Sequence, residues 1–231
     1  TTTTTSILFK FVTRKRTKQP HLSFFSSGYD HVLLESYLVP YLYEKGYGPK
    51  MEKRGNKVSN IKTRNGTSFR DITKLLAPST NLRNFGRLFN LEQAKAHFPF
   101  GILTSVEVLN RAGLPEDPES WKSDLTGGDK ITVEQIAEAQ RLFESANCRN
   151  LGDYLRAYLR LDVVILYKAT QEWRKTLKTY VGIDFVETGK YTISSLANLA
   201  GLKSSASQQH IGTFFPNNSQ VYRLLRNGMR G

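Results

Sequence analysis

The 231-residue sequence has few of the residues that form crosslinks or metal sites, since it contains one cysteine, Cys148, and four histidines. A single cysteine excludes an internal disulfide, and no cysteine and histidine cluster has the spacing of a zinc site. The sequence also lacks a glycine-rich phosphate loop and any apolar run long enough to cross a bilayer. We therefore expect a chain without a membrane span, in a reducing, intracellular environment.

Acidic residues are also scarce. Lys and Arg number 33 against 20 Asp and Glu, which gives a formal net charge of +13. No acidic residue precedes Asp30, whereas basic residues are frequent in the same stretch. This balance favours a polyanionic partner, most simply nucleic acid, and the alternative is a basic surface that contacts only solvent. The first residues resemble a mitochondrial transit peptide in composition, but five threonines form a poor helix, so mitochondrial import stays an alternative.

Hydrophobic residues (39%) and aromatic residues (11%) are frequent enough for a folded core. The clearest local pattern is a hairpin, in which alternating segments 57–64 and 67–72 flank Asn65 and Gly66. Asn-Gly accepts positive φ at both turn positions and predicts a tight turn. A short strand is predicted at 21–25, followed by a helix at 31–46 that Pro40 kinks or breaks. Other predicted elements are helices at 82–89, 102–110, 132–146, 194–202 and 219–227, and a loop at 113–128.

The most informative stretch is a predicted helix from Leu151 to about Tyr180, in which apolar residues recur every three or four positions. Asp162 lies inside it, directly before four aliphatic residues. A carboxylate beside a core stays ionised only with a cation, a metal or strong donors. Tyr158 lies one turn earlier on the same face, where its phenol could orient a water. The alternative is that Asp162 bonds to nearby backbone or to Arg160 and has no other role.

Several segments, in order, resemble the exonuclease region of protein-primed family B DNA polymerases, the branch found in Polinton or Maverick elements, organellar plasmids and some DNA viruses. Residues 24–30, Phe-Phe-Ser-Ser-Gly-Tyr-Asp, resemble the second exonuclease motif, and Tyr158 with Asp162 resembles the third. Residues 69–76, Phe-Arg-Asp-Ile-Thr-Lys-Leu-Leu, are similar to a segment that contacts single-stranded DNA. Residues 98–100, 114–115, 139–140 and 147–153 resemble spacer sequence of this branch, and 226–231 resembles the start of the element that leads to the polymerase palm.

The resemblance implies a proofreading site in which two divalent metals, Mg or Mn, activate the water that attacks the terminal phosphodiester. Asp30 and Asp162 would be metal ligands that converge in the fold, and Tyr158 would position the water. On local sequence alone, an N-cap role for Asp30 is favoured. Charge and resemblance together predict nucleic-acid contacts at Arg14, Lys15, Arg16, Lys62, Arg64, Thr73, Lys74, Arg226 and Arg230.

The sequence departs from the family pattern at several positions. The first exonuclease motif, Asp-x-Glu, should precede Asp30, where no acidic residue occurs. Asp117-Pro-Glu119 fits the Asp-x-Glu pattern, but it lies in a proline-rich loop after the second motif, so we treat it as unrelated. The family's His-Asn before the second motif is Phe24-Phe25, and its Ser/Thr-Leu contact is Ile72-Thr73. We therefore expect weak or lost metal binding, no bound metal and no nuclease activity from this chain alone.

The expected fold class is α/β: an incomplete ribonuclease-H-like exonuclease fold with a β-hairpin and a mainly helical C-terminal half. We expect a basic N-terminal arm (1–20), an exonuclease-like domain (21–190) and a helical segment (191–231) that leads towards the palm. The first functional hypothesis is a region of a family B DNA polymerase, active in replication and proofreading but inactive as this chain. The alternative is a noncatalytic basic subunit of a nucleoprotein assembly such as a mitochondrial ribosome. Protein partners would then cover the N-terminal arm and the sheet edge, and charge alone does not separate DNA from RNA.

Overall fold

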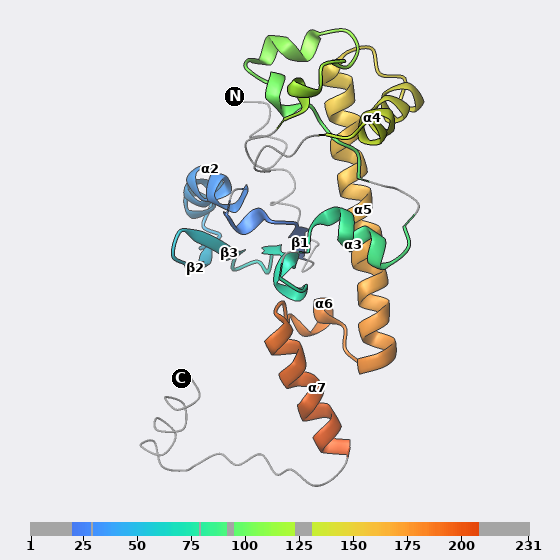
Figure 1. Cartoon of the computed structure of the whole chain (residues 1–231). Helices are drawn as coiled ribbons and strands as arrows, with labels where there is room; N and C mark the ends of the chain where they lie inside the picture. Colours follow the sequence, from blue (N-terminus) through green and yellow to red (C-terminus); the bar gives the residue numbers. More distant parts are fainter. Residues whose placement is uncertain (1–19, 29, 79, 92–94, 123–130, 208–231) are drawn as a thin grey trace.

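The computed structural model describes residues 20–28, 30–78, 80–91, 95–122 and 131–207, and its longest element is helix α5 (Leu151–Val181). Figure 1 shows α5 running beside the other parts of the molecule, with the sheet on one side. The Asn150 side chain caps its start by accepting a hydrogen bond from the Asp153 N–H (2.9 Å), and Gly182 ends it with a φ of 67°. The long helix predicted from apolar periodicity is confirmed.

A four-stranded sheet lies beside α5. Its strands are β1 (Pro20–Ser23), β2 (Lys50–Arg54), β3 (Lys57–Lys62) and β4 (Ser68–Asp71), in the order β1-β4-β3-β2. β1 pairs with β4 in parallel, and the other pairs are antiparallel. Helix α2 (Asp30–Glu44), which contains Pro40 without a break, packs its Leu38 and Leu42 against this sheet. Strand β2 was not predicted, because only one of its five residues is apolar and it shows no alternation.

The predicted hairpin is confirmed as β3 and β4, but its turn differs from the prediction. Only Gly66 has a positive φ (90°), so positive φ at both turn positions is wrong for Asn65. The loop is longer than two residues, because Thr63 and Thr67 close it through a 2.9 Å backbone hydrogen bond. The Asn65 side chain accepts a hydrogen bond from the Thr67 N–H (3.1 Å), and this side-chain contact stabilises the three-residue loop.

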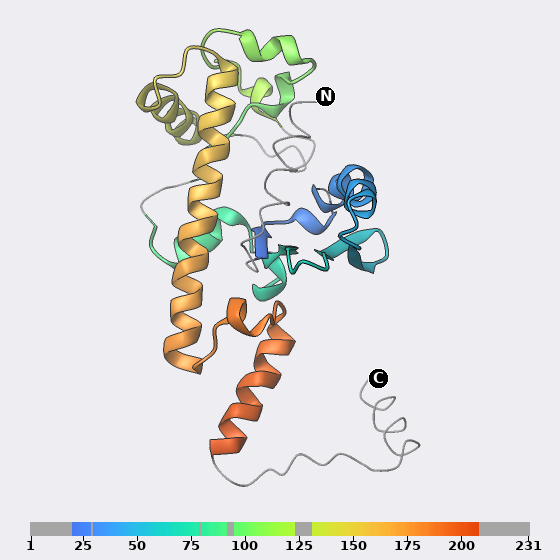
Figure 2. The same ribbon diagram turned by 180° about the vertical axis from the view of Figure 1, so that it is seen from behind.

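The remaining helices lie at different heights along α5. Figure 2 shows from behind that one helix lies beside the upper end of α5 and that the last described helix extends away below its lower end. Helices α3 (Leu82–Leu88), α4 (Val133–Ser145) and α7 (Ile193–Ser207) confirm three predictions, and Thr132 caps α4. The helix predicted at 102–110 is wrong. One 3₁₀ helix ends at Ile102, and after the extended Ser105 a second covers Val106–Asn110. The short elements are η1 (Ser26–Gly28), η2 (Ile72–Leu75), η3 (Phe100–Ile102), η4 (Val106–Asn110), η5 (Pro118–Trp121) and α6 (Phe185–Thr188). The predicted helix 219–227 lies outside the described residues.

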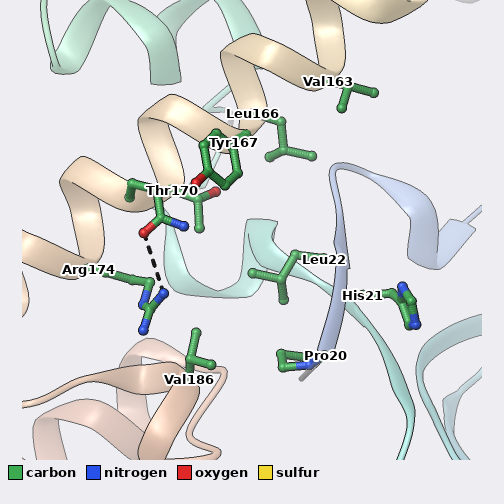
Figure 3. A pocket seen from close by; sticks show the side chains of 10 residues that line it. Pro20, His21, Leu22, Val163, Leu166, Tyr167, Thr170, Arg174 and Val186 are labelled. Atoms are coloured by element: carbon green, nitrogen blue, oxygen red, sulfur yellow. Dashed lines mark hydrogen bonds between the residues drawn. The ribbon is translucent and has the colours of Figure 1, made fainter. Parts of the chain in front are cut away.

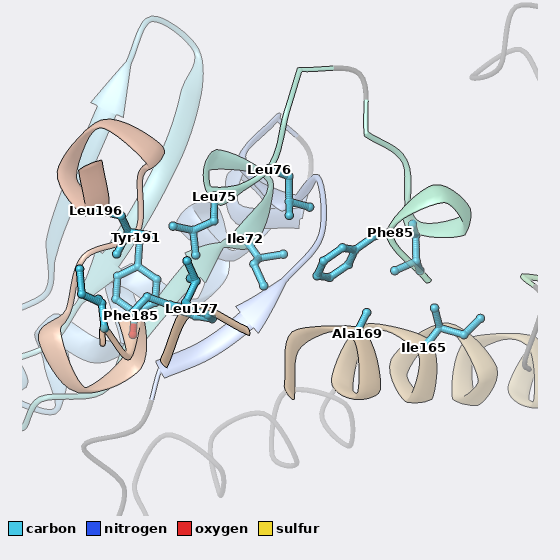
Figure 4. Close-up of a cluster of buried hydrophobic side chains, with 12 residues drawn as sticks. Ile72, Leu75, Leu76, Phe85, Ile165, Ala169, Leu177, Phe185, Tyr191 and Leu196 are labelled. Carbon is cyan, nitrogen blue, oxygen red and sulfur yellow. The ribbon is translucent and has the colours of Figure 1, made fainter. Parts of the chain in front are cut away.

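Three hydrophobic clusters hold these elements together, and α5 contributes to two of them. Figure 4 shows the cluster at its second half, where Phe85 of α3 lies beside Ile165 and Ala169. The cluster at its first half contains Tyr154 and Trp121, and the third lies between α2 and the sheet. The described residues thus form a mixed α/β fold with a mainly helical C-terminal half, as predicted. None of their helices combines the length and apolar character needed to cross a bilayer.

Candidate functional site

The segment that resembles the second exonuclease motif lies between β1 and α2. Asp30 is the first residue of α2 and is exposed. Its neighbour His31 is buried, and its Nδ1 lies 2.8 Å from the Val58 carbonyl oxygen. A carbonyl only accepts, so Nδ1 carries the proton and Nε2 accepts from the Ser26 hydroxyl at 3.1 Å. His31 therefore fixes the start of α2 and the preceding turn against β3.

A second carboxylate, Asp71 at the end of β4, lies against the turn that precedes Asp30. Asp71 is buried and accepts hydrogen bonds from the Ser27 N–H (2.9 Å), the Thr73 N–H (3.0 Å) and the Thr73 hydroxyl (2.7 Å). Burial would raise the pKa of Asp71, but these bonds outweigh it and lower the pKa. Although Asp30 is largely exposed, the partial desolvation of its carboxyl raises its pKa, the charge of His31 lowers it, and the charge of Asp71 raises it. Sequence analysis missed Asp71. Its signal is an Asp at the end of a strand, because an Asp side chain often accepts a hydrogen bond from the backbone N–H two residues later in an Asx turn.

The residues that resemble the third motif lie on α5. The Tyr158 side chain is buried, with its ring centroid 5.7 Å from that of Phe98 and 6.3 Å from that of Phe100. The Asp162 Oδ2 atom lies 3.3 Å from the Lys95 Nζ, whereas its buried Oδ1 has no hydrogen-bond partner among the described residues. Burial raises the pKa of Asp162, and Lys95 and Tyr158 oppose this rise. The cation that this half-buried carboxylate needs is thus Lys95 rather than Arg160.

Helix α3 holds Lys95 in this position. The Arg83 guanidinium donates a 2.7 Å hydrogen bond from Nη2 to the Lys95 carbonyl oxygen and lies 3.1 Å from His97 Nδ1. The same nitrogen is 3.9 Å from the Glu138 carboxylate of α4. Arg83 therefore connects α3 with α4 and with the backbone of Lys95, whose side chain contacts Asp162 on α5. Sequence analysis missed Lys95, because no local pattern connects a loop lysine with a distant helix.

The predicted metal ligands have different neighbours. Asp30 is influenced by His31 and Asp71, and Asp162 by Lys95 and Tyr158. Over the described ranges, no group of three or more His, Cys, Asp or Glu side chains is placed to hold a metal. The buried Oδ1 of Asp162 could serve a cation, but the Lys95 ammonium already supplies a positive charge at Oδ2. The described residues by themselves therefore do not fit a pair of divalent ions, and convergence of Asp30 with Asp162 stays a prediction.

The predicted nucleic-acid contacts fall in two groups. Lys62 and Arg64 are exposed at the hairpin end, and Lys74 is exposed after β4. Gly48 makes room for Arg64, because a Cβ there would lie 2.5 Å from the Arg64 Nε. The Thr73 hydroxyl donates to Asp71. The other predicted contacts, Arg14, Lys15, Arg16, Arg226 and Arg230, lie outside the described residues.

A groove of about 370 Å³, here called the edge groove, lies between β1 and α5. Figure 3 shows His21 and Leu22 of β1 on one side and Val163, Leu166 and Thr170 of α5 on the other. The His21 Nε2 and Thr170 Oγ1 atoms are buried without a hydrogen-bond partner in the described part of the chain. β1 is a terminal strand of the sheet, so the groove follows its outer edge.

Comparison with known families identifies the protein class. A family model of DNA polymerases matches residues 25–231, a range that contains Asp30, Asp71 and Asp162. The chain is therefore part of a family B DNA polymerase. The family is described as DNA polymerase type B, organellar and viral, and the chain belongs to it. No curated protein and no solved structure matches the chain. Membership connects the chain with DNA replication and with nucleic acid as a partner, and family B polymerases generally use Mg²⁺ or Mn²⁺.

Proposed function

We propose that this chain is the 3′–5′ proofreading exonuclease region of its polymerase, and that by itself it binds nucleic acid without cutting it. The observation that carries the proposal is the environment of Asp162. This half-buried carboxylate has Tyr158 on the same helix face, as the third exonuclease motif requires, but its charge is balanced by Lys95. The arrangement keeps Tyr158 and Asp162 together on one helix face but provides too few free carboxylate oxygens for a complete metal site.

The sheet supports an incomplete ribonuclease-H-like fold. β1 and β4 are adjacent and parallel. Asp71 is the last residue of β4, and Asp30 begins the helix that follows β1. Functional sites of open α/β sheets lie beyond the carboxyl ends of parallel strands. Asp71 accepts a 2.9 Å hydrogen bond from the Ser27 N–H in the turn that leads to Asp30, so this end of the sheet carries both acids.

The expected lack of cleavage follows from charge. Phosphodiester hydrolysis by two metals needs several ionised carboxylates to hold the cations that stabilise the attacking and leaving oxygens. Asp71 uses its oxygens for Ser27 and Thr73, and Asp162 uses one for Lys95. Asp30 and the free oxygen of Asp162 are then the acceptors left for a metal among the predicted ligands.

A nuclease assay tests this proposal. A 5′-labelled single-stranded oligonucleotide is incubated with the chain and Mg²⁺ or Mn²⁺, with the Asp162→Ala variant as the matched control. We expect no shortening from the 3′ end with either protein. Degradation by the wild type that disappears in Asp162→Ala would show an active site and refute the inactive assignment.

Nucleic-acid binding is tested at the hairpin. Lys62→Ala with Arg64→Ala removes two exposed charges, and Lys175→Ala with Lys178→Ala on the far half of α5 is the control of equal charge. If both hairpin residues contact phosphates of a single strand, the slope of log K against log salt becomes smaller by about 1.4. Equal effects of the two double variants would mean that the hairpin is not a binding site.

A second candidate function is a noncatalytic nucleic-acid-binding subunit of a nucleoprotein assembly, with a protein partner over the edge groove. The favouring observation is that β1 is a terminal strand beside the groove, and that Thr170 Oγ1 on the opposite wall is buried without a hydrogen-bond partner among the described residues. Such an edge presents N–H and C=O groups to another strand. Amide exchange of residues 20–23 should then be slower in the assembly than in the isolated chain, and equal exchange would argue against it.

A further inference from the structure

The first half of α5 carries arginines that neither the exonuclease motifs nor the proposed function uses. A hollow of about 410 Å³ lies where the connection from α4 enters α5, and Arg149, Arg156 and Arg160 line it together with Asp153. We propose that this arginine hollow binds phosphate groups of a nucleic-acid strand. The inference rests on the proposed function only because it takes nucleic acid as the partner. The residues that line the hollow are separate from the hairpin and from Asp162.

The geometry presents guanidinium groups to solvent. Arg156 and Arg160 lie one helical turn apart and so share a face of α5. Asp153 contacts two of the arginines, with Oδ2 3.5 Å from the Arg149 Nε and Oδ1 2.8 Å from an Arg156 Nη. The Arg149 and Arg156 side chains nevertheless remain 88% and 70% exposed. Asp153 therefore orients two guanidinium groups without covering them.

The charge of the hollow is not balanced. Three arginines face one aspartate, a formal excess of two positive charges. Arg160 is exposed and has no ion pair among the described residues. An anion that enters the hollow would meet guanidinium donors that are still free. Because Asp153 already orients two of these side chains, less conformational entropy is lost when the anion binds.

The distribution of arginine and lysine along α5 supports an anion with several oxygens. The hollow has arginine at all three basic positions, whereas the second half of the helix carries Lys168, Lys175 and Lys178. The one arginine there, Arg174, holds the Asp184 carboxylate with two hydrogen bonds, of 2.6 and 3.2 Å. A planar guanidinium is suited to such two-point contacts with carboxylate or phosphate, which a lysine ammonium cannot make.

Nucleic acid fits the hollow better than an acidic protein does. Protein interfaces depend on large apolar or aromatic anchors at their centre, and the uncharged lining residues here are small, at positions 146–148 and 157. The chain also carries a net charge of +13 and belongs to a DNA polymerase family. A phosphate backbone needs only the cationic donors that the hollow offers.

The test compares two triple variants of the full chain by fluorescence anisotropy with a labelled oligothymidylate at several salt concentrations. One is Arg149→Ala, Arg156→Ala and Arg160→Ala, and the control of equal charge is Lys175→Ala, Lys178→Ala and Lys190→Ala. Three lost phosphate contacts should lower the slope of log K against log salt by about 2, and the control should lower it by less than half as much. An unchanged slope in the arginine variant, or equal effects of the two variants, would overturn the inference.

A measurement on the wild type avoids dependence on variant folding. Phenylglyoxal modifies exposed arginines, and mass spectrometry should show Arg149, Arg156 and Arg160 protected by the oligonucleotide while exposed Arg87 of α3 is not. The inference would be overturned if inorganic phosphate at the same ionic strength protected the three arginines equally well, or if the oligonucleotide did not protect them. If the wild type binds no oligonucleotide, the proposed function fails too. If the hairpin variant weakens binding and the arginine variant does not, only this inference fails.

Discussion

The contact between Lys95 and Asp162 gives the sharpest prediction for stability. At the observed 3.3 Å and an effective dielectric constant of about 20, Coulomb's law gives about 5 kcal/mol. The side chains of Lys95 and Asp162 are 31% and 21% exposed, so solvent screening and desolvation reduce the net value. We expect Lys95→Met to lower the free energy of unfolding by about 1–3 kcal/mol at pH 7, because it leaves a half-buried carboxylate without its cation.

The pH dependence of this effect has a definite sign. Burial already raises the pKa of Asp162 above the usual 3.8, and loss of Lys95 removes an opposing influence and raises it further. A raised pKa means that the ionised carboxylate is unfavourable in the folded state. The variant therefore regains stability when the pH falls through that pKa, because Asp162 then takes up a proton. The difference between wild type and variant should therefore be largest at neutral pH and smaller near pH 4.

Urea denaturation of a double-mutant cycle with Lys95→Met and Asp162→Asn measures the effect. In the Asp162→Asn background, removal of the ammonium should change the free energy of unfolding by less than about 0.5 kcal/mol, since no carboxylate remains to be paired. A coupling energy near zero, or an effect of Lys95→Met that is independent of pH, would show that the ion pair does not stabilise this site and would refute the reasoning.

Three further changes test the fold. Asp71→Asn should destabilise by about 1–3 kcal/mol at pH 7. Because the pKa of Asp71 is lowered, its contribution is present above about pH 3.8 and is lost at lower pH, so urea midpoints of the variant should depend less on acid than those of the wild type. Gly66→Ala should cost about 1–3 kcal/mol, because its φ is 90°, and unchanged thermal stability would contradict the turn geometry. Phe85→Ala should cost about 3–5 kcal/mol, whereas exposed Leu88→Ala on the same helix should change stability by less than about 0.5 kcal/mol.

Local patterns in the sequence were sufficient for much of the fold. The apolar periodicity of α5, the Thr132 cap of α4 and the Asn-Gly turn between β3 and β4 each depend on residues close together in the chain. The predictions were wrong where local signals are weak. Charged β2 shows no alternation, and the apolar stretch at 102–110 forms 3₁₀ turns because the backbone is extended at Ser105.

The candidate site divides in the same way. The sequence alone placed Tyr158 and Asp162 on one helix face and showed that a carboxylate beside an apolar run needs a partner, because helical spacing and the energy of burying a charge are local properties. Only the tertiary structure decided that the partner is Lys95, that Asp71 contacts the turn before Asp30, and that three arginines with one aspartate line a hollow at the start of α5. These are contacts between residues that chain folding brings together, and no periodicity or spacing in the sequence specifies them.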